Sequence, residues 1–509
     1  MSARALMVLG TASHVGKSIL VTALCRIFAQ DGVAVAPFKA QNMSLNSAAT
    51  PDGREIGRAQ ALQAEAAGIA PTVEMNPVLL KPTGERRSQV VLLGRIFDEI
   101  DAFDYHRRRG DELFPAVIEA YHRLAAAYDL VVLEGAGSPA EINLKATDIV
   151  NLRMAQAADA RCILVGDIDR GGVFASLLGT LELLEPHERA RISAFVINKF
   201  RGDRTLLYPG IAQIEERLGI PCAGVVPWLP DLDLDDEDSV SLDERPRVSR
   251  LRWAATSDRS RKLRIAVVAF PHLSNFTDFD ALAQEPSVDL GYASTAKEIE
   301  TADLVILPGS KATMLDLTWM REHGFDAAIT RAAKRALVLG VCGGMQMLGA
   351  SIADPERIES GGAAQGLALL SIDTTLQSEK ITRLVHGSFA GTELFGQPLA
   401  SLDICGYEIH VGATSLCAPA FPLLRIRRNG GTETLDDGAV EPSGRVVGTY
   451  VHGLLASDAT RHAFIRAARA ATGLEPASRV NCIAAGREAR LNRLAAHVRS
   501  SLDLSLLLA

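Results

Sequence analysis

Residues 5–30, ALMVLGTASHVGKSILVTALCRIFAQ, constrain the fold more than any other stretch of the chain. Residues 5–10 form a short apolar run, as expected for a strand that is buried on both faces. Residues 17–30 carry apolar side chains at helical spacing. Between them, GTASHVGKS at 10–18 has its glycines, lysine and serine in the context that a phosphate loop requires. This order of strand, loop and helix predicts a parallel α/β sheet with a nucleotide phosphate at its edge.

Three side chains are candidates for the chemistry at this loop. We expect Lys17 to hold the β- and γ-phosphate oxygens of ATP and Ser18 to offer its hydroxyl to Mg²⁺. Glu134 follows the apolar run 130–133 and precedes a glycine-rich turn, where a carboxylate can reach the same ion directly or through water. A helix-capping role is the alternative for Glu134. The loop departs from the strict pattern, because five residues, and not four, separate Gly10 from Gly16.

Two further polar residues end strand-like runs in the same half of the chain. Lys39 ends the run 33–39, where a lysine can offset the charge of a transferred phosphoryl group. Asn198 lies near the end of the run 193–200 and is a candidate for reading the adenine edge. An ordinary turn role is equally compatible with Asn198.

Short apolar runs recur along the chain at helix-length intervals, which predicts a doubly wound parallel sheet in the first half and a second α/β domain after it. An acidic stretch, 231–246, separates the two halves. We therefore expect a domain at 1–230, a linker at 231–260 and a domain at 261–509. The tail, 456–509, is expected to form helices that pack on the second domain. The remaining strand-like runs are 162–169, 222–227, 263–270, 302–309, 335–341 and 444–453.

Composition narrows the class of protein. The 509 residues carry a net charge of −8, which gives no electrostatic case for binding nucleic acid or an anionic membrane. No apolar run is long enough to predict a membrane helix, and residues 1–11 are interpreted as a first strand and not as a signal peptide. The seven cysteines form no CxxC pair. The scattered cysteines thus predict a reducing cytoplasm and argue against a disulfide framework or a zinc site.

The stretch GVCGG at 340–344 fits the pattern of a nucleophile elbow with cysteine as the nucleophile. Small neighbours allow a strained turn that projects Cys342, and the start of the following helix favours its thiolate. The N–H of Gly343 is a candidate oxyanion donor, with a second donor expected at Gly309 or Ser310. The alternative is a buried packing cysteine.

A cysteine nucleophile needs a base. His452, in GTYVHG, ends a strand and precedes a glycine, so we expect it to meet Cys342 at the sheet edge. His410, in GYEIHVG, is the rival candidate.

Taken together, these motifs resemble those of the cobyric acid synthase family of glutamine-dependent corrinoid amidotransferases. The front half resembles the dethiobiotin synthetase type of P-loop domain, whose longer G-T-x-x-x-x-G-K-[ST] loop accounts for the spacing at residues 10–18. The rear half resembles a class I glutamine amidotransferase domain of flavodoxin-like α/β fold. The strings that carry the resemblance are FKAQNMSLNS (38–47), MNPVLLKPTGERRSQV (75–90), EGAGSPAEINL (134–144), GDIDRGGVFAS (166–176), VINKFRGD (196–203), GVCGGMQMLG (340–349), GYEIHVG (406–412) and YVHG (450–453).

The resemblance implies an activity. Glutamine would be hydrolysed through a Cys342 thioester with His452 as acid and base. Ammonia would then pass to the ATP- and corrinoid-binding amidation domain, where ATP·Mg²⁺ turns a carboxylate into an acyl phosphate. Four carboxylates, b, d, e and g of adenosylcobyrinic acid a,c-diamide, would become amides. Classical class I enzymes carry a glutamate two residues after the histidine; here Leu454 stands there, so the group that orients His452 is open.

The resemblance also suggests binding residues and leaves alternatives. The residues implied for the nucleotide are Thr11, Gly16, Lys17, Ser18 and Asn198, and those implied for the corrinoid are Gln41, Asn42, Ser44 and Lys81. One alternative is an amidotransferase for another carboxylate, such as cobyrinic acid at a and c or a cell-wall precursor. The other is a P-loop regulatory ATPase with an inactive glutaminase-like domain.

Overall fold

The computed structural model describes residues 3–82, 87–230, 232, 251, 253 and 258–508. The chain forms two compact units. The first unit comprises Met1–Ser44, Glu55–Glu237 and Arg487–Ala509, and the second comprises Leu45–Arg54 and Asp238–Gly486. Most of the expected linker, 231–260, lies outside the described residues.

The core of the first unit is a parallel sheet in the order β12-β11-β10-β1-β9-β2, which confirms the predicted doubly wound sheet. Its strands coincide with the apolar runs of the first half because strands covered on both faces contain few polar residues. Leu6, Val8, Leu130 and Val132 are fully buried. The strands are β1 (Arg4–Gly10), β2 (Val35–Phe38), β9 (Leu130–Glu134), β10 (Arg161–Asp167), β11 (Ile192–Phe200) and β12 (Cys222–Pro227).

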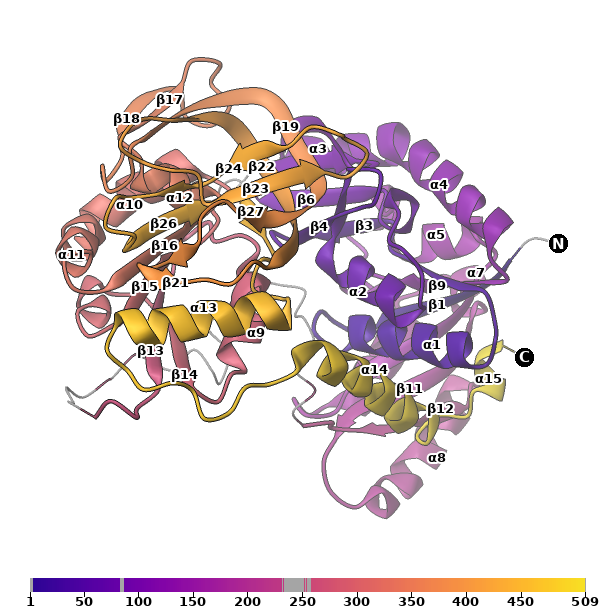
Figure 1. Ribbon diagram of the computed structural model, residues 1–509. Helices are drawn as coiled ribbons and strands as arrows, with labels where there is room; N and C mark the ends of the chain where they lie inside the picture. The colour runs from indigo at the N-terminus through magenta and orange to yellow at the C-terminus, as the bar shows by residue number, and fades with distance from the viewer. Residues whose placement is uncertain are drawn as a thin grey trace. The chain divides into compact units, whose positions relative to one another are not determined.

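Helices of the first unit lie around this sheet (Figure 1). The helix predicted at 17–30 is α1, with the same bounds. A smaller sheet in the order β3-β6-β7-β8 follows the second strand. Its strands are β3 (Gln41–Met43), β6 (Val78–Pro82), β7 (Arg87–Leu92) and β8 (Arg95–Asp101). The helices are α1 (Lys17–Gln30), α2 (Arg58–Ala66), α3 (Ala102–Arg108), α4 (Phe114–Ala127), α5 (Leu152–Ala157), α6 (Val173–Glu182), α7 (Pro186–Arg189) and α8 (Tyr208–Leu218).

The end of the chain differs from the predicted domain boundaries. Residues 487–509 belong to the first unit, so the expectation that the whole tail packs on the second domain was wrong. Helix α14 (Ile483–Arg499) lies beside α1 in Figure 1, and Leu491 and Val498 are buried in the same core as Leu24. Helical spacing shows that such a helix has an apolar face but not which sheet the face covers. The short helix α15 (Ser505–Leu508) follows α14.

Residues 45–54 depart from the expected boundaries in the opposite direction, because they belong to the second unit. The Ser47 N–H donates to Asn275 Oδ1 at 3.0 Å, and Ala49 packs against Tyr407 and Ile409. Ten residues of polar and small side chains carry no sequence signal for a change of unit. Only the packing partners of this segment identify where it belongs.

The second unit contains a parallel sheet in the order β14-β13-β15-β16-β26, to which β25 adds in antiparallel fashion. This sheet confirms the α/β fold expected for the rear half. Its strands are β13 (Leu263–Val268), β14 (Val288–Ala293), β15 (Leu304–Leu307), β16 (Leu337–Val341), β25 (Ala439–Val440) and β26 (Val446–Thr449). The helices of this unit are α9 (Asp280–Ala283), α10 (Thr313–Glu322), α11 (Phe325–Ala332), α12 (Gly343–Leu348) and α13 (Asp458–Ala471).

A second, mostly antiparallel sheet in this unit was not predicted. Its longest strands, β19 (Ile372–Phe389) and β22 (Asp403–Leu416), pair along most of their length. They alternate polar and apolar residues and so lack the continuous apolar runs that identified the parallel strands. The other strands are β17 (Ser351–Asp354), β18 (Gly362–Gln365), β23 (Leu424–Arg428), β24 (Leu435–Asp437) and β27 (Val451–His452).

Candidate active sites

The phosphate loop joins β1 to α1 in the first unit. Gly16 has φ 99°, a left-handed conformation that favours glycine, and a Cβ there would collide with the Asn198 side chain. Lys17 opens the helix and lies across the loop, since its Nζ donates to Ala12 O at 2.9 Å and to Gly137 O at 3.0 Å. The Thr11 N–H donates to Val165 O at 2.9 Å, which ties the start of the loop to the neighbouring strand. The loop thus has the shape of a phosphate cradle.

Ser18, Lys39 and Glu134 come together beside this loop. The Ser18 hydroxyl donates to Glu134 Oε1 at 2.8 Å, and Lys39 Nζ lies 2.9 Å from the same oxygen. Gln63 Nε2, from α2, donates to Glu134 Oε2 at 2.7 Å. The Glu134 side chain is 1% exposed. The ends of neighbouring strands β2 and β9 supply Lys39 and Glu134, because parallel strands place their carboxyl ends at one edge.

These groups fit a nucleotide-linked magnesium ion. Hydroxyl and carboxylate oxygens are hard ligands, and Mg²⁺ in phosphate sites takes one or two protein groups together with phosphate and water oxygens. Ser18 and Glu134 supply that set. Across the described residues, no group of three or more His, Cys, Asp or Glu side chains could hold a metal ion, so a magnesium site here would depend on the nucleotide for further ligands.

The structure holds Asn198 against the phosphate loop. Its Nδ2 donates to Val15 O at 2.8 Å. The next residue, Lys199, donates to His14 O at 2.5 Å and to Asp167 Oδ2 at 2.8 Å. The end of β11 therefore contacts the phosphate loop and helps to hold its conformation. The reading of adenine by Asn198 stays a prediction.

The residues expected to meet the corrinoid divide into two groups. Gln41 accepts a hydrogen bond from the Tyr105 hydroxyl at 2.5 Å, and Asn42 Nδ2 donates to Gln60 Oε1 at 3.1 Å. Ser44 directly follows β3, the strand that contains Gln41 and Asn42, and is buried at 4% exposure. Lys81 is different, because its Nζ lies 2.6 Å from Glu55 Oε1 and the pair is buried. Its charge is therefore already balanced inside the protein, as the charge of Lys39 is by Glu134, and its role in binding the corrinoid stays a prediction.

Cys342 has the geometry of a nucleophile elbow in the second unit. It lies between β16 and α12 with φ 53° and ψ −114°, a strained conformation for a residue with a side chain. Its N–H donates to Thr449 O at 2.8 Å. A Cβ on Gly344 would collide with the Leu307 carbonyl, so the close approach of the turn to that strand requires glycine. The thiol points toward Ile409 O, at 3.6 Å.

The loop expected to complete the oxyanion site lies against this turn. A Cβ placed on Gly343 would be 3.1 Å from Ser310 N, and one placed on Gly309 would be 3.2 Å from His452 Cε1. Asp316 holds this loop in place. Its carboxylate accepts a hydrogen bond from the Ser310 hydroxyl at 2.5 Å and lies 2.8 Å from His272 Nδ1. The two predicted donor regions are therefore next to one another and next to the catalytic histidine.

His452 is held by a carboxylate that the sequence did not identify. Its Nδ1 lies 2.6 Å from Asp278 Oδ2, and Asp278 Oδ1 accepts the Gly453 N–H at 3.0 Å. The Tyr407 ring stacks on the imidazole at 5.4 Å. Burial lowers the pKa of His452, but the Asp278 carboxylate, with a smaller contribution from Cys342, outweighs it and raises the pKa to about 10. The other ring nitrogen, Nε2, is buried and is not engaged by Asp278.

His410 does not share this position. Its ring stacks on Tyr450 at 3.8 Å, Nδ1 lies 3.2 Å from Gly412 O and Nε2 lies 3.4 Å from Glu408 Oε1. Arg428 Nε donates to the same Glu408 carboxylate at 2.6 Å. His410 therefore belongs to a buried polar network on strand β22, and the geometry favours His452 as the partner of Cys342.

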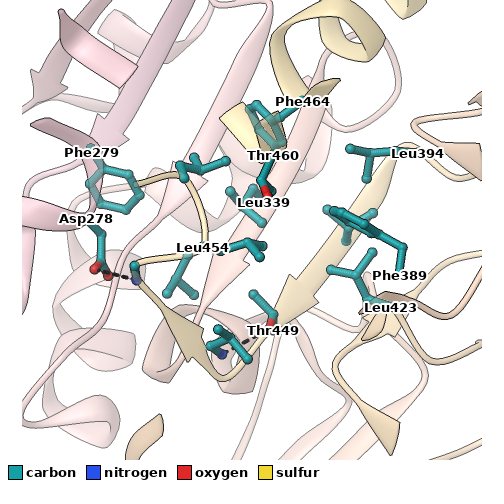
Figure 2. A pocket seen from close by; sticks show the side chains of 15 residues that line it. Asp278, Phe279, Leu339, Phe389, Leu394, Leu423, Thr449, Leu454, Thr460 and Phe464 are labelled. Atoms are coloured by element: carbon teal, nitrogen blue, oxygen red, sulfur yellow. Dashed lines mark hydrogen bonds between the residues drawn. The ribbon is translucent and has the colours of Figure 1, made fainter. Parts of the chain in front are cut away.

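Leu454, two residues after the histidine, points into an apolar cavity of ≈ 20 Å³ (Figure 2). Leu339, Phe464 and other apolar side chains line it, and Asp278 lies at its edge with its carboxylate on the Gly453 N–H. A glutamate at 454 would have to enter this apolar space. Asp278, which holds the histidine, lies on the turn Phe276–Phe279 before α9.

Two residues of these sites, Asp278 and Gln63, were missed by sequence reasoning. Asp278 is one of two aspartates in SNFTDFD (274–280), 174 positions from the histidine that it holds. No spacing rule links them. The available signal was the place of this segment after β13, since loops at the carboxyl ends of parallel strands line ligand crevices.

Comparisons with known proteins agree with this arrangement. Residues 6–241 match the CobQ/CobB/MinD/ParA nucleotide binding domain, and residues 264–460 match the CobB/CobQ-like glutamine amidotransferase domain. A cobyric acid synthase from Moorella thermoacetica is 48% identical over 511 residues, covering 100% of this chain and 97% of the relative. Cobyric acid synthases from Citrobacter koseri and Salmonella heidelberg are each 49% identical, covering 98% of this chain and 97% of each relative.

The order of the two domains, the phosphate loop and the cysteine elbow thus occur in a chain that is similar to these relatives along its whole length. The chain belongs to the cobyric acid synthase family, the glutamine amidotransferases that form amides in cobalamin biosynthesis.

Proposed function

We propose that this chain converts adenosylcobyrinic acid a,c-diamide into adenosylcobyric acid. It would amidate the b, d, e and g side-chain carboxylates with ammonia from glutamine, at the expense of ATP. The observation that carries this proposal is the 48% identity to a cobyric acid synthase over 100% of the chain, which includes both domains and not the glutaminase part alone. Every substrate is a small molecule.

The glutaminase step follows from the groups around Cys342. The thiolate attacks the amide carbon of glutamine, and the oxyanion that forms accepts hydrogen bonds from the Gly343 N–H and from the Gly309–Ser310 loop. His452 gives the proton from Nε2 to the departing nitrogen, which leaves as ammonia. A water molecule then attacks the thioester while His452 takes its proton, and glutamate departs. Asp278 keeps the ring oriented and stabilises its charged form through both steps.

Activation of the acceptor follows from the groups around the phosphate loop. A carboxylate is a poor electrophile and an acyl phosphate is a good one. The acceptor oxygen therefore attacks the γ-phosphorus of ATP, the bond to the bridging oxygen breaks, ADP leaves and an acyl phosphate forms. Lys17 and Lys39 offset the charge that spreads over the transferred phosphoryl group. Ser18 and Glu134 would hold a magnesium ion, whose positive charge draws electron density from the phosphate oxygens. Ammonia then attacks the acyl carbon, and phosphate leaves.

The ion pair between Lys39 and Glu134 supports this assignment. Both side chains are nearly fully buried, at 7% and 1% exposure, and each compensates the charge of the other at 2.9 Å. Binding of ATP brings phosphate to the lysine and a cation to the carboxylate, so both charges stay compensated when the pair separates. Thr11, Gly16 and Asn198 would bind the nucleotide, while Gln41, Asn42 and Ser44 would face the corrinoid.

Mass spectrometry tests the proposal. The full chain is incubated with adenosylcobyrinic acid a,c-diamide, ATP, Mg²⁺ and amide-¹⁵N glutamine. We expect a series of products that ends at four labelled amides. An unchanged corrinoid, in a preparation whose glutaminase and ATPase activities are both measurable, would overturn the substrate assignment and leave the two-site chemistry in place. Cobyrinic acid in a parallel reaction tests the a and c positions.

A further inference from the structure

Two glutamines on helix α2 are fully buried in the first unit, which is uncommon for this residue type. Gln60 and Gln63 are each 0% exposed. Leu62 and Ala66 of the same helix pack in the core that contains Leu20 of α1. Apolar packing therefore holds α2 against the core, and the two buried amides need a separate explanation.

The amide of Gln63 contacts both residues that are proposed to hold magnesium. Its Nε2 donates to Glu134 Oε2 at 2.7 Å and to the backbone oxygen of Ser18 at 3.4 Å. Ser18 and Glu134 also meet directly, because the Ser18 hydroxyl donates to Glu134 Oε1 at 2.8 Å. One amide group thus joins the backbone of one proposed ligand to the carboxylate of the other.

The two oxygens of the Glu134 carboxylate have different partners. Ser18 and Lys39 both contact Oε1, whereas Gln63 contacts Oε2. The last torsion of a glutamate side chain has a broad energy minimum, so a carboxylate that is not held turns easily. A donor fixed on Oε2 restricts this rotation and keeps Oε1 directed at the Ser18 hydroxyl. Removal of such a partner from a metal ligand typically lowers metal affinity by about tenfold to a hundredfold.

Packing alone does not explain the Gln63 side chain. Its Oε1 is buried and has no hydrogen-bond partner among the described residues. A buried acceptor in this state lowers stability, so an apolar side chain of similar size would suit the core better. An ionised carboxylate can only accept hydrogen bonds, and the amide must therefore turn its N–H groups toward Glu134 and leave its oxygen unpaired. The contribution of Gln63 is thus its donor to Glu134.

We propose that Gln63 is a positioning residue of the magnesium site. It fixes Ser18 and Glu134 relative to one another and sets the direction of the Glu134 carboxylate, so that both ligands are in place before Mg·ATP binds. This inference rests on the proposed function, in which Ser18 and Glu134 hold the ion. Loss of the Gln63 donor should therefore weaken the contribution of magnesium to nucleotide binding and leave binding without magnesium unchanged.

Nucleotide binding with and without magnesium tests this inference in the full-length enzyme. The non-hydrolysable ATP analogue AMP-PNP is titrated by calorimetry in excess EDTA and again in saturating Mg²⁺. Q63M removes the donor and keeps the length of the side chain. The gain in affinity that Mg²⁺ gives the wild type should be smaller by about tenfold in Q63M, while the Kd in EDTA should be equal. Glutamine hydrolysis without acceptor should stay at the wild-type rate.

Gln60 provides the matched control. It lies three residues before Gln63 on α2, is equally buried and accepts a hydrogen bond from Asn42 Nδ2 at 3.1 Å. Its own Nε2 is buried and finds no partner in the described part of the chain. Q60M therefore removes the same group from the same helix without removing a contact to Glu134, and its gain from Mg²⁺ should equal that of the wild type. Thermal unfolding of both variants measures how much of a loss comes from the fold.

The possible outcomes separate the inference from the proposed function. Where Q63M does not fold, Q63N carries the test, because it draws the amide back from Glu134 by one methylene and should lose the same gain. An unchanged gain from Mg²⁺ in folded Q63M, or an equal loss in Q60M, would overturn the inference. AMP-PNP binding that weakens equally with and without Mg²⁺ would also overturn it and assign Gln63 to the shape of the phosphate loop. A wild type that gains nothing from Mg²⁺ would instead overturn the magnesium site of the proposed function.

Discussion

The phosphate loop and the cysteine turn follow the same plan and are completed in different ways. In each, a strand of a parallel sheet ends, the chain turns sharply and a helix begins, at β1 and α1 in the first unit and at β16 and α12 in the second. The phosphate loop is a single run of nine residues, 10–18, which Glu134 and Asn198 contact from later strands. The cysteine turn has one strained residue, and its partners come from segments that are far apart in the sequence.

The two sites also differ in how their charges are compensated. Lys39 and Glu134 pair with each other, so each charge is already compensated before a ligand binds. In the cysteine site, Asp278 contacts the His452 ring at Nδ1. The Asp278 carboxylate and Cys342 together raise the pKa of His452. If the proposed functions are right, the phosphate site has to rearrange when it binds its ligand, whereas the glutaminase site is preorganised for its reaction.

The largest effect is expected for a change that should stop the glutaminase site and leave the phosphate site active. C342A removes the nucleophile, so amidation driven by glutamine should fall by about 10⁴-fold or more. Amidation driven by added ammonium salt should continue, because the phosphate site does not need the thiol. Parallel assays with the two nitrogen sources measure this difference. Loss of both activities in a folded C342A protein would show that the two sites cannot be treated as separate.

A change in the phosphate loop should lower amidation with both nitrogen sources. K17A removes the ammonium group that spans the phosphate loop, and we expect amidation with either glutamine or ammonia to fall at least about a hundredfold. Basal hydrolysis of glutamine should remain. Release of ADP and formation of amide are measured together. Normal amidation by K17A would contradict the assignment of the loop.

The next effect tests the preorganised chain of the glutaminase site. D278N should lower kcat for glutamine hydrolysis by about 10²- to 10⁴-fold, since the carboxylate orients and charges the imidazole. His452 is charged below its pKa, which is raised to about 10, so the wild type keeps the imidazolium through neutral pH. Without the carboxylate, burial lowers this pKa, and activity should be lost at a lower pH on the alkaline side.

Asp280 serves as the control for this change, because it lies on the same segment and D280N leaves Asp278 in place. Its pH profile should coincide with that of the wild type. A D278N profile with an unshifted alkaline limb would mean that Asp278 holds the fold of the segment and not the charge of His452.

The smallest effect distinguishes the two histidines. H410Q disturbs the network of Glu408 and Tyr450 but leaves Cys342 and His452 in place. Glutamine hydrolysis should therefore fall less than about tenfold, while the free energy of unfolding should drop by about 1–3 kcal/mol as a buried hydrogen bond is lost. Denaturant titration and a glutaminase assay measure the two quantities. A loss of activity as large as that of H452Q would reverse the assignment.

Much of the fold was predictable, and the limits have physical causes. The parallel strands of the first unit were predicted because burial on both faces gives continuous apolar runs, and so were those of the second unit except β14, Val288–Ala293. Strands β19 and β22 were missed because they alternate polar and apolar residues and run longer than typical strands. Lys17, Ser18, Lys39 and Glu134 were proposed from motifs and strand ends, and the structure brings these four together.

The residues of the candidate sites were also predicted only in part from the sequence. Cys342 and His452 were proposed from their glycine-rich turns, and the structure places both beside the loop at Gly309. Lys81 was suggested by the resemblance, and only the structure shows that it pairs with Glu55.

The sequence by itself determined the parts that depend on neighbouring residues: the phosphate loop, the elbow at Cys342, the strands of the parallel sheets and the family to which the chain is similar. Local sterics, helix starts and side-chain burial specify these features within a few turns of chain. The tertiary structure alone decided which carboxylate holds His452 and which unit receives residues 45–54 and 487–509. These depend on contacts between residues distant in the chain, which packing of whole elements determines and sequence spacing does not encode.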